Sequence, residues 1–184
     1  MRVFIAIELS AEVQEELRRV QDQLKPAGAD VKWVEPEDIH LTLKFLGDVS
    51  LELIAEVKKQ LDALVKVHQR FELTIGGVGA FPKVEYPRVI WVGAERGAEQ
   101  TVELANSLEE KLLNFGFLKE KRQLKPHLTL GRVRSSQNRN QLRELLQSVT
   151  VQPKTSQVET VVLFESTLTS QGAIYKALHK VKLS

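Results

Sequence analysis

One tetrapeptide that occurs twice constrains this chain more than any other feature. His-Leu-Thr-Leu stands at positions 40–43 and again at 127–130 of 184 residues, so the copies lie at matching places in the two halves. On a β-strand, alternate side chains point to opposite faces. We therefore predict two amphipathic strands, whose leucines enter a core and whose His-Thr pairs line a surface.

The segments around the two copies also match. Arg2–Glu8 and Arg88–Gly93 are both rich in β-branched apolar residues, which predicts strands, and each precedes a helical pattern and then the motif strand. A further helix and strand follow each motif. We predict an α+β fold made by internal duplication, with two antiparallel β-sheets that face a central cleft and helices outside. The chain would be one two-lobed domain, 1–184, with repeat halves of about 1–87 and 88–184.

The remaining patterns predict where individual elements begin and end. Ser10 and Ser50 are suited to cap the first two helices, and apolar residues at helical spacing continue these helices to Leu24 and Leu64. Glycine and proline between 78 and 87 predict a loop there. Further helices are expected at 97–116 and 138–147, strands at 71–75, 158–164 and 173–181, and a turn at 166–172.

Composition excludes several classes of site and indicates a ligand charge. The chain has no cysteine, which excludes disulfides, thiolate metal sites and a cysteine nucleophile. Its apolar N-terminal run, 3–7, is too short for a signal peptide or a membrane span, so we expect a cytoplasmic protein without membrane contact. Net charge is only +2, but 119–143 holds eight Lys or Arg and one acidic residue, Glu120. This basic stretch favours an anionic ligand.

Two imidazoles on facing surfaces suit an in-line displacement at phosphorus. Imidazole exchanges protons near neutral pH, so one ring can deprotonate the entering oxygen while the other protonates the leaving oxygen. The hydroxyls of Thr42 and Thr129 could donate to the non-bridging oxygens, and Arg132 could add a forked charged contact. His40 and His127 are therefore the candidate catalytic pair.

Other interpretations of the same residues remain open at this stage. A single HLTL segment is an ordinary amphipathic strand, and a duplication could keep two structural copies. Asp38, His40 and Thr42 could instead hold a metal, but Lys125 replaces the aspartate in the second copy. His68 and His179 lack the His-x-Thr context, so we expect no catalytic role for them.

The segments HLTLKFLG around His40 and KPHLTLGRVR around His127, together with the opening RVFIAIELS, resemble the two-histidine phosphoesterases. Within that superfamily the chain is similar, over essentially its full length, to the RNA 2′,3′-cyclic phosphodiesterases, also named 2′-5′ RNA ligases. The resemblance implies a two-lobed fold and a hydrolase that needs neither metal nor cofactor. It implies His40 as proton donor, His127 as proton acceptor, and Thr42, Thr129 and Arg132 as phosphate-binding residues.

The implied substrate is an RNA with a 2′,3′-cyclic phosphate end, opened to a 2′-phosphomonoester, and tRNA-like fragments are candidates. Two alternative functions would use the same site residues or the same positive charge. A ligase would use an RNA 5′-hydroxyl in place of water, and a non-catalytic RNA-binding module would need only the basic stretch. We expect the protein to act as a monomer.

Overall fold

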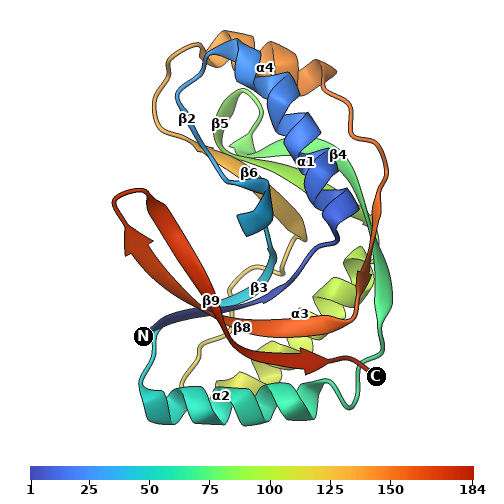
Figure 1. Ribbon diagram of the computed structural model, residues 1–184, viewed down its shortest axis with the longest axis vertical. Helices are drawn as coiled ribbons and strands as arrows, with labels where there is room; N and C mark the ends of the chain where they lie inside the picture. Colours follow the sequence, from blue (N-terminus) through green and yellow to red (C-terminus); the bar gives the residue numbers. More distant parts are fainter.

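The computed structural model describes residues 1–184 and contains four α-helices and nine β-strands (Figure 1). The helices are α1 (Ala11–Leu24), α2 (Leu51–Leu64), α3 (Ala98–Leu113) and α4 (Arg139–Ser148). The strands are β1 (Arg2–Ile7), β2 (Val31–Trp33), β3 (Leu41–Asp48), β4 (Phe71–Lys83), β5 (Tyr86–Arg96), β6 (His127–Val133), β7 (Thr155–Val158), β8 (Thr160–Thr169) and β9 (Gly172–Lys182). None of the helices has the length and apolar character needed to cross a membrane.

The strands form two antiparallel sheets, as the sequence predicts. Sheet A has the order β3-β1-β8-β9, and sheet B has the order β2-β6-β5-β4-β7. In Figure 1, α1 and α4 lie with sheet B in the upper part of the molecule, whereas α2 and α3 lie with sheet A in the lower part. The predicted α+β class, with two sheets and outer helices, is therefore confirmed.

The two sheets do not coincide with the two sequence halves. β1 pairs with β3 of its own half but also with β8 of the second half. Reciprocally, β5 pairs with β6 of its own half but also with β4 of the first half. Each half therefore gives two strands to the sheet built around the other, β2 and β4 to sheet B and β8 and β9 to sheet A, which ties the two lobes together.

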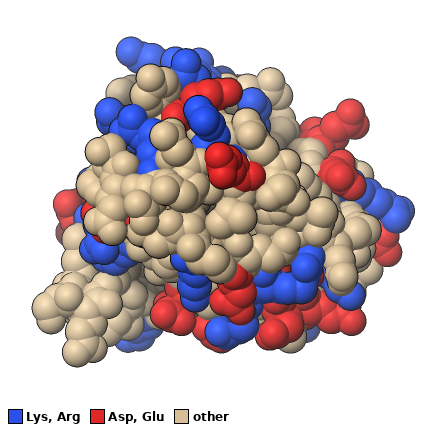
Figure 2. Space-filling model, turned by 90° about the horizontal axis from the view of Figure 1, so that it is seen from above, with Lys and Arg blue, Asp and Glu red and all other residues tan.

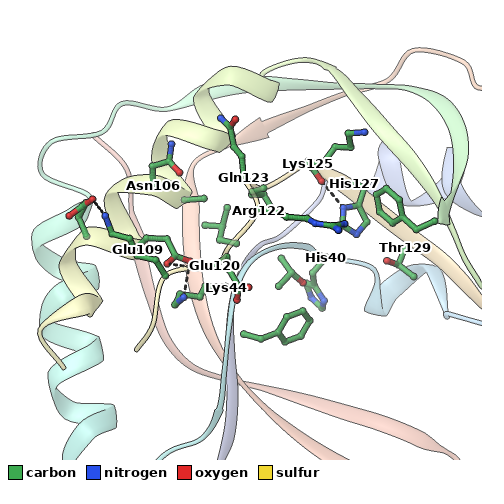
Figure 3. Close-up of a pocket in the computed structure, with 18 of the residues that line it drawn as sticks. His40, Lys44, Asn106, Glu109, Glu120, Arg122, Gln123, Lys125, His127 and Thr129 are labelled. Atoms are coloured by element: carbon green, nitrogen blue, oxygen red, sulfur yellow. Dashed lines mark hydrogen bonds and ion pairs between the residues drawn. The ribbon is translucent and has the colours of Figure 1, made fainter. Parts of the chain in front are cut away.

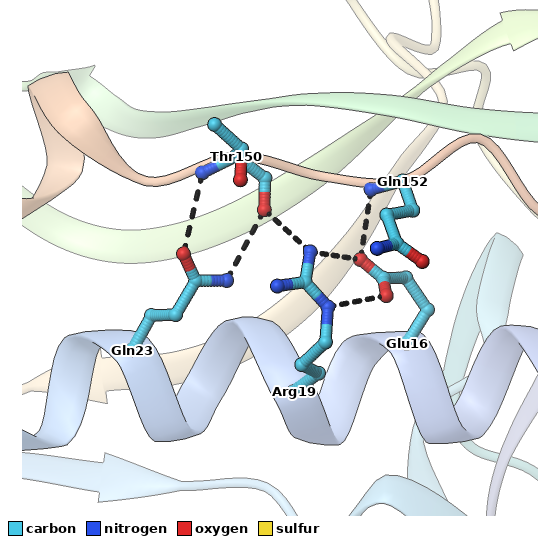
Figure 4. Close-up of polar contacts among 5 residues, drawn as sticks. All are labelled: Glu16, Arg19, Gln23, Thr150 and Gln152. Carbon is cyan, nitrogen blue, oxygen red and sulfur yellow. Dashed lines mark hydrogen bonds and ion pairs between the residues drawn. The ribbon is translucent and has the colours of Figure 1, made fainter.

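Local capping sets the start of the first two helices. The side chains of Ser10 and Ser50 accept hydrogen bonds from the backbone N–H groups of Val13 and Leu53, as predicted. Across the molecule, α1 is held to the segment after α4 by a polar cluster (Figure 4). The buried Glu16 carboxylate accepts bonds from Arg19 and from the backbone N–H of Gln152. Burial alone would raise the pKa of Glu16, but these bonds and nearby cationic charge hold it below its usual value.

Three sequence predictions about element boundaries are wrong. The expected loop at 78–87 is instead a continuation of β4 into a tight hairpin with β5. Gly77 adopts a φ of +72° beside a register shift in the β4–β5 ladder, so the glycine forms a bulge and does not end the strand. The turn expected at 166–172 is shorter, because β8 and β9 remain paired to Thr169 and Gly172. The edge strand β7 is polar and was not predicted.

The leucines of both motifs are buried, as strand alternation predicts. Leu41, Leu43, Leu128 and Leu130 are at most 4% exposed. They belong to one hydrophobic cluster of 34 residues that reaches both sheets. The exchanged strands therefore join the two lobes through one main core.

Shortening either motif leucine should strongly destabilise the fold. Leu41→Ala and Leu128→Ala remove fully buried atoms and leave a cavity, which costs about 2–5 kcal/mol. Urea unfolding measures this loss. Leu51→Ala is the matched control, because Leu51 is 73% exposed and should change stability little. A Leu41 variant as stable as the Leu51 variant would contradict the assignment of strand faces.

Candidate active site

The two His-Thr pairs line one cleft of about 790 Å³ between the sheets (Figure 3). The sequence predicts His40 within the motif strand, but β3 begins at Leu41, so His40 immediately precedes it, and Thr42 lies within β3. His127 is the first residue of β6, and Thr129 follows on the same face. All four side chains come from motif strands whose leucines point the other way into the core, so strand alternation creates the site.

A β-bulge follows each His-Thr pair. The pairing of β1 with β3 passes from Thr42 to Lys44, and the pairing of β5 with β6 passes from Thr129 to Gly131. In each copy, the leucine that is left out of the strand pairing and the residue after it are both buried. The side chain that follows these two residues lines the cleft. It is Phe45 in the first copy and Arg132 in the second. Arg132 therefore shares the cleft with the histidines, as the sequence predicts.

His40 lies on an aromatic surface of sheet A. Its ring centroid is 4.6 Å from that of Phe164 and 5.5 Å from that of Tyr175. Burial lowers the pKa of His40, although a backbone hydrogen bond to Asp38 and the charges of Glu8 and Asp38 act in the opposite direction. In the free protein this environment favours the neutral imidazole, and the imidazolium form is a stronger acid than an exposed one.

His127 is held by its backbone neighbour. Its Nδ1 lies 2.6 Å from the carbonyl oxygen of Lys125. A carbonyl can only accept a hydrogen bond, so Nδ1 carries a proton. In the neutral ring, Nε2 is then the atom with a free lone pair, and it is available to take a proton.

Each histidine packs on a phenylalanine from the other half of the sequence. His40 contacts Phe164 of β8, and His127 makes an edge-to-face contact with Phe81 of β4, at 5.0 Å between centroids. Both β4 and β8 are among the strands that the halves exchange. The exchange therefore supplies the apolar support that orients both rings.

Arg122 is a candidate site residue that the sequence analysis did not single out. It lies in the loop between α3 and β6, and in Figure 3 its side chain extends toward His127. Sequence reasoning placed it only within the basic stretch, because the course of a loop cannot be inferred from charge. In the structure it lines the same cleft as both histidines.

The unpaired charge in the cleft is mainly positive. Arg122, Lys125 and Arg132 line it and make no ion pair, whereas the lining carboxylates of Glu109 and Glu110 are paired with lysines. Glu120 is the one lining carboxylate without an ion pair. On the face shown in Figure 2, by contrast, charges of both signs are interspersed around a broad uncharged area. The cleft thus suits an anionic ligand.

A buried ion pair anchors the loop that carries Arg122. Lys44 Nζ lies 2.7 Å from Glu109 Oε1 on α3 and donates to the Leu118 carbonyl oxygen at 2.9 Å. The other carboxylate oxygen of Glu109 accepts the backbone N–H of Glu120. One lysine on β3 therefore connects the motif strand, α3 and the loop.

The structure shows no cluster of metal ligands at the motifs, and the other two histidines lie outside the cleft. No three His, Asp or Glu side chains converge as a set of metal ligands. His179 pairs with Asp62 of α2 at 2.8 Å, and neither it nor His68 lines the cleft.

Comparison with known proteins identifies the family. The family model described as LigT like Phosphoesterase matches residues 7–91 and 92–175. The RNA 2′,3′-cyclic phosphodiesterase of Methanothermobacter thermautotrophicus is 38% identical, over all of this chain and 99% of that protein. The protein of the same name from Escherichia coli is 32% identical, over 83% of this chain and 77% of that protein.

Solved structures agree with this relationship over the whole chain. A protein of Thermus thermophilus superposes with a TM-score of 0.83 at 28% identity, covering all of this chain and 98% of that one. Escherichia coli LigT complexed with 3′-AMP gives a TM-score of 0.78 at 26% identity, with the same coverage. With both halves matched by the family model and relatives matched along their full length, the chain belongs to the LigT-like phosphoesterase family.

Proposed function

We propose that the protein hydrolyses RNA 2′,3′-cyclic phosphate ends to 2′-phosphomonoesters by metal-independent acid-base catalysis. The observation that carries this proposal is the convergence of His40 and His127 in one cleft, each with a threonine beside it. Relatives that match the whole chain are named RNA 2′,3′-cyclic phosphodiesterases, which supports the choice of substrate.

In the proposed reaction, water attacks phosphorus as the bond to the 3′-oxygen breaks. Nε2 of His127 takes the proton from water, a role for which its tautomer is suited. His40 in its imidazolium form gives its proton to the departing 3′-oxygen. Thr42 and Thr129 donate hydrogen bonds to the non-bridging oxygens, and Arg132 and Arg122 balance their charge.

The experiment that tests the proposal uses a short RNA ending in a 2′,3′-cyclic phosphate, with a chelator present. We expect turnover to a 2′-phosphate, identified by phosphorus NMR or by enzymatic end-group analysis. A 3′-phosphate would overturn the orientation of the substrate, and loss of turnover with chelator would overturn the metal-independent mechanism. Binding without turnover would favour the non-catalytic RNA-binding module.

The ligase alternative needs one addition to the same experiment. A second RNA with a 5′-hydroxyl end would compete with water for the same phosphorus and yield a 2′-5′ bond. Water is in vast excess over any RNA end, so we expect hydrolysis to dominate. A joined product that exceeds the 2′-phosphate would favour the ligase.

Replacing Arg132 should weaken both binding and turnover. A charged hydrogen bond to phosphate contributes about 1.5–3 kcal/mol, so Arg132→Ala should lower kcat/KM by roughly 10- to 100-fold. Lysine should restore part of this loss, since it keeps the charge but lacks the fork. Arg134→Ala is the control, because Arg134 pairs with Asp30 and does not line the cleft. Equal kcat/KM values for the Arg132 and Arg134 alanine variants would remove Arg132 from the site.

The pH profile of kcat/KM should be bell-shaped, because one imidazole must be neutral and the other charged. The two limbs report the free enzyme, in which burial lowers the pKa of His40 below its ordinary value near 6.5. In a His127→Ala variant with residual activity, only the His40 limb remains. If His40 is the donor, kcat/KM of that variant should fall as pH rises through the lowered pKa. If kcat/KM rises through it instead, His40 is the acceptor.

A further inference from the structure

The outer part of the β8–β9 hairpin projects from sheet A as a ribbon of only two strands (Figure 1). β1 pairs with β8 as far as Glu165, so beyond that residue β9 is the single neighbour of β8. Residues 166–175, which we call the hairpin ledge, include no charged side chain. Thr169 holds the turn, since its hydroxyl donates to the carbonyl oxygen of Gly172 and accepts from the backbone N–H of Gln171.

One face of the hairpin ledge continues the aromatic surface on which His40 lies. Strand alternation along β8 places Ser166 and Leu168 on the same face as Phe164. Tyr175 of β9 belongs to this face too, because it is paired with Ser166. The rings of Phe164 and Tyr175 both contact the ring of His40, at 4.6 and 5.5 Å between centroids. A ligand that extends outward from His40 over sheet A therefore meets the ledge next.

Each face of the hairpin ledge carries one exposed branched apolar residue. Leu168 is 67% exposed and lies on the face shared with Phe164, about 13 Å farther along the strand. Ile174 is 60% exposed and is paired with Thr167, so it lies on the opposite face. Only the face of Leu168 is continuous with the candidate active site. The two residues thus provide a matched pair for testing which face binds a ligand.

The opposite side of the cleft offers a different chemistry. Arg122, Lys125 and Arg132 come from β6 and the loop before it, and their charges are free of ion pairs, which suits phosphate groups. Burial and the charge of Asp38 raise the pKa of Tyr175, whereas the charge of Arg132 opposes this rise. The inner end of the ledge therefore lies within electrostatic reach of these cations. A single RNA strand between the two sides could direct its phosphates to the cations and a base to the uncharged ledge.

We propose that the hairpin ledge binds the base of the penultimate RNA nucleotide, through the face that carries Leu168, while the terminal nucleotide lies between the histidines. This proposal rests on the proposed function and extends it from the RNA end to the nucleotide before it. The position of Leu168 outside the cleft lining, beyond Tyr175, suits a group farther from the phosphate than the terminal nucleotide. Contact through apolar side chains tolerates every base, so the ledge would favour longer RNA without selecting a sequence.

Substrates of two lengths provide the functional measurement. For the dinucleotide adenylyl-adenosine 2′,3′-cyclic phosphate, we expect Leu168→Ser to lower kcat/KM by about 5- to 20-fold, because it removes the apolar surface that the base would cover. For adenosine 2′,3′-cyclic monophosphate, which has no penultimate base, kcat/KM should stay unchanged. Ile174→Ser is the matched control on the opposite face, and it should alter neither value. Leu168→Phe keeps an apolar surface, so it should retain the preference for the dinucleotide.

Leu168→Trp provides a direct measurement of contact. The hydrolysed dinucleotide, with its 2′-phosphate, should quench the fluorescence of the new tryptophan beyond any change seen in the unmodified protein. Adenosine 2′-monophosphate and inorganic phosphate should produce no such quenching, because neither reaches the ledge. Ile174→Trp is the control for non-specific quenching and should respond to none of the three.

Two results would overturn the proposal. One is equal quenching of Leu168→Trp and Ile174→Trp by the dinucleotide. The other is a folded Leu168→Ser variant, checked by circular dichroism, whose ratio of kcat/KM for dinucleotide and mononucleotide equals that of the unmodified protein, as expected if the RNA runs along the loop before β6 instead. Failure of the proposed function is distinguishable, because the unmodified protein would then turn over neither substrate. Fluorescence would still decide whether the ledge binds the dinucleotide.

Discussion

Alanine at His40 or at His127 is expected to lower kcat by about 10²- to 10⁴-fold while the fold stays intact. Loss of a general acid or base has this size, which corresponds to roughly 3–5 kcal/mol in the barrier. Both rings lie on the cleft side of strands whose core side is occupied by leucines, so their removal should change stability little. The double variant should be only slightly slower than either single variant, because the two residues act as a unit.

Single-turnover kinetics with a cyclic-phosphate RNA measures this effect on the chemical step. His179→Ala is the matched control, since His179 pairs with Asp62 outside the cleft and should leave kcat unchanged. Circular dichroism verifies the fold of each variant. A folded His40 or His127 variant that keeps the turnover of the unmodified protein would remove that histidine from the mechanism.

Glu109→Ala is expected to be among the most destabilising changes at the cleft. The Lys44 side chain is only 3% exposed, and this change would leave its ammonium group buried without an opposite charge. Removing one partner of a buried pair costs about 3–5 kcal/mol. Because the pair also holds the loop that carries Arg122, KM should rise in any variant that still folds.

Urea unfolding of single and double variants separates the ion pair from simple packing. Lys44→Met combined with Glu109→Leu should recover much of the stability, since an apolar pair can replace a buried ion pair at little cost. Glu110→Ala is the control, because it breaks the exposed pair with Lys119 and should cost less than about 1 kcal/mol. If Glu109→Ala and Glu110→Ala lower the free energy of unfolding by similar amounts, the buried Lys44–Glu109 pair contributes no more to stability than the exposed pair.

The sequence by itself determined the features that depend on local periodicity. Strand alternation in the two HLTL segments separated the buried leucines from His40, Thr42, His127 and Thr129, and the structure places these faces as predicted. Serine caps and helical spacing located the first two helices, and the repeated order of elements indicated two sheets. These features could be inferred because the chemistry of neighbouring residues specifies them.

Only the tertiary structure decided which groups surround the histidines. The exchange of β4 and β8 brings Phe81 to His127 and Phe164 to His40, and strand pairing over such distances leaves no signal in one sequence. The bulges that expose Phe45 and Arg132 exist only in register with β1 and β5. Arg122 reaches the cleft through a loop anchored by Lys44 and Glu109, residues far apart in the chain. Each of these features depends on contacts between distant segments, which form only when the chain is folded.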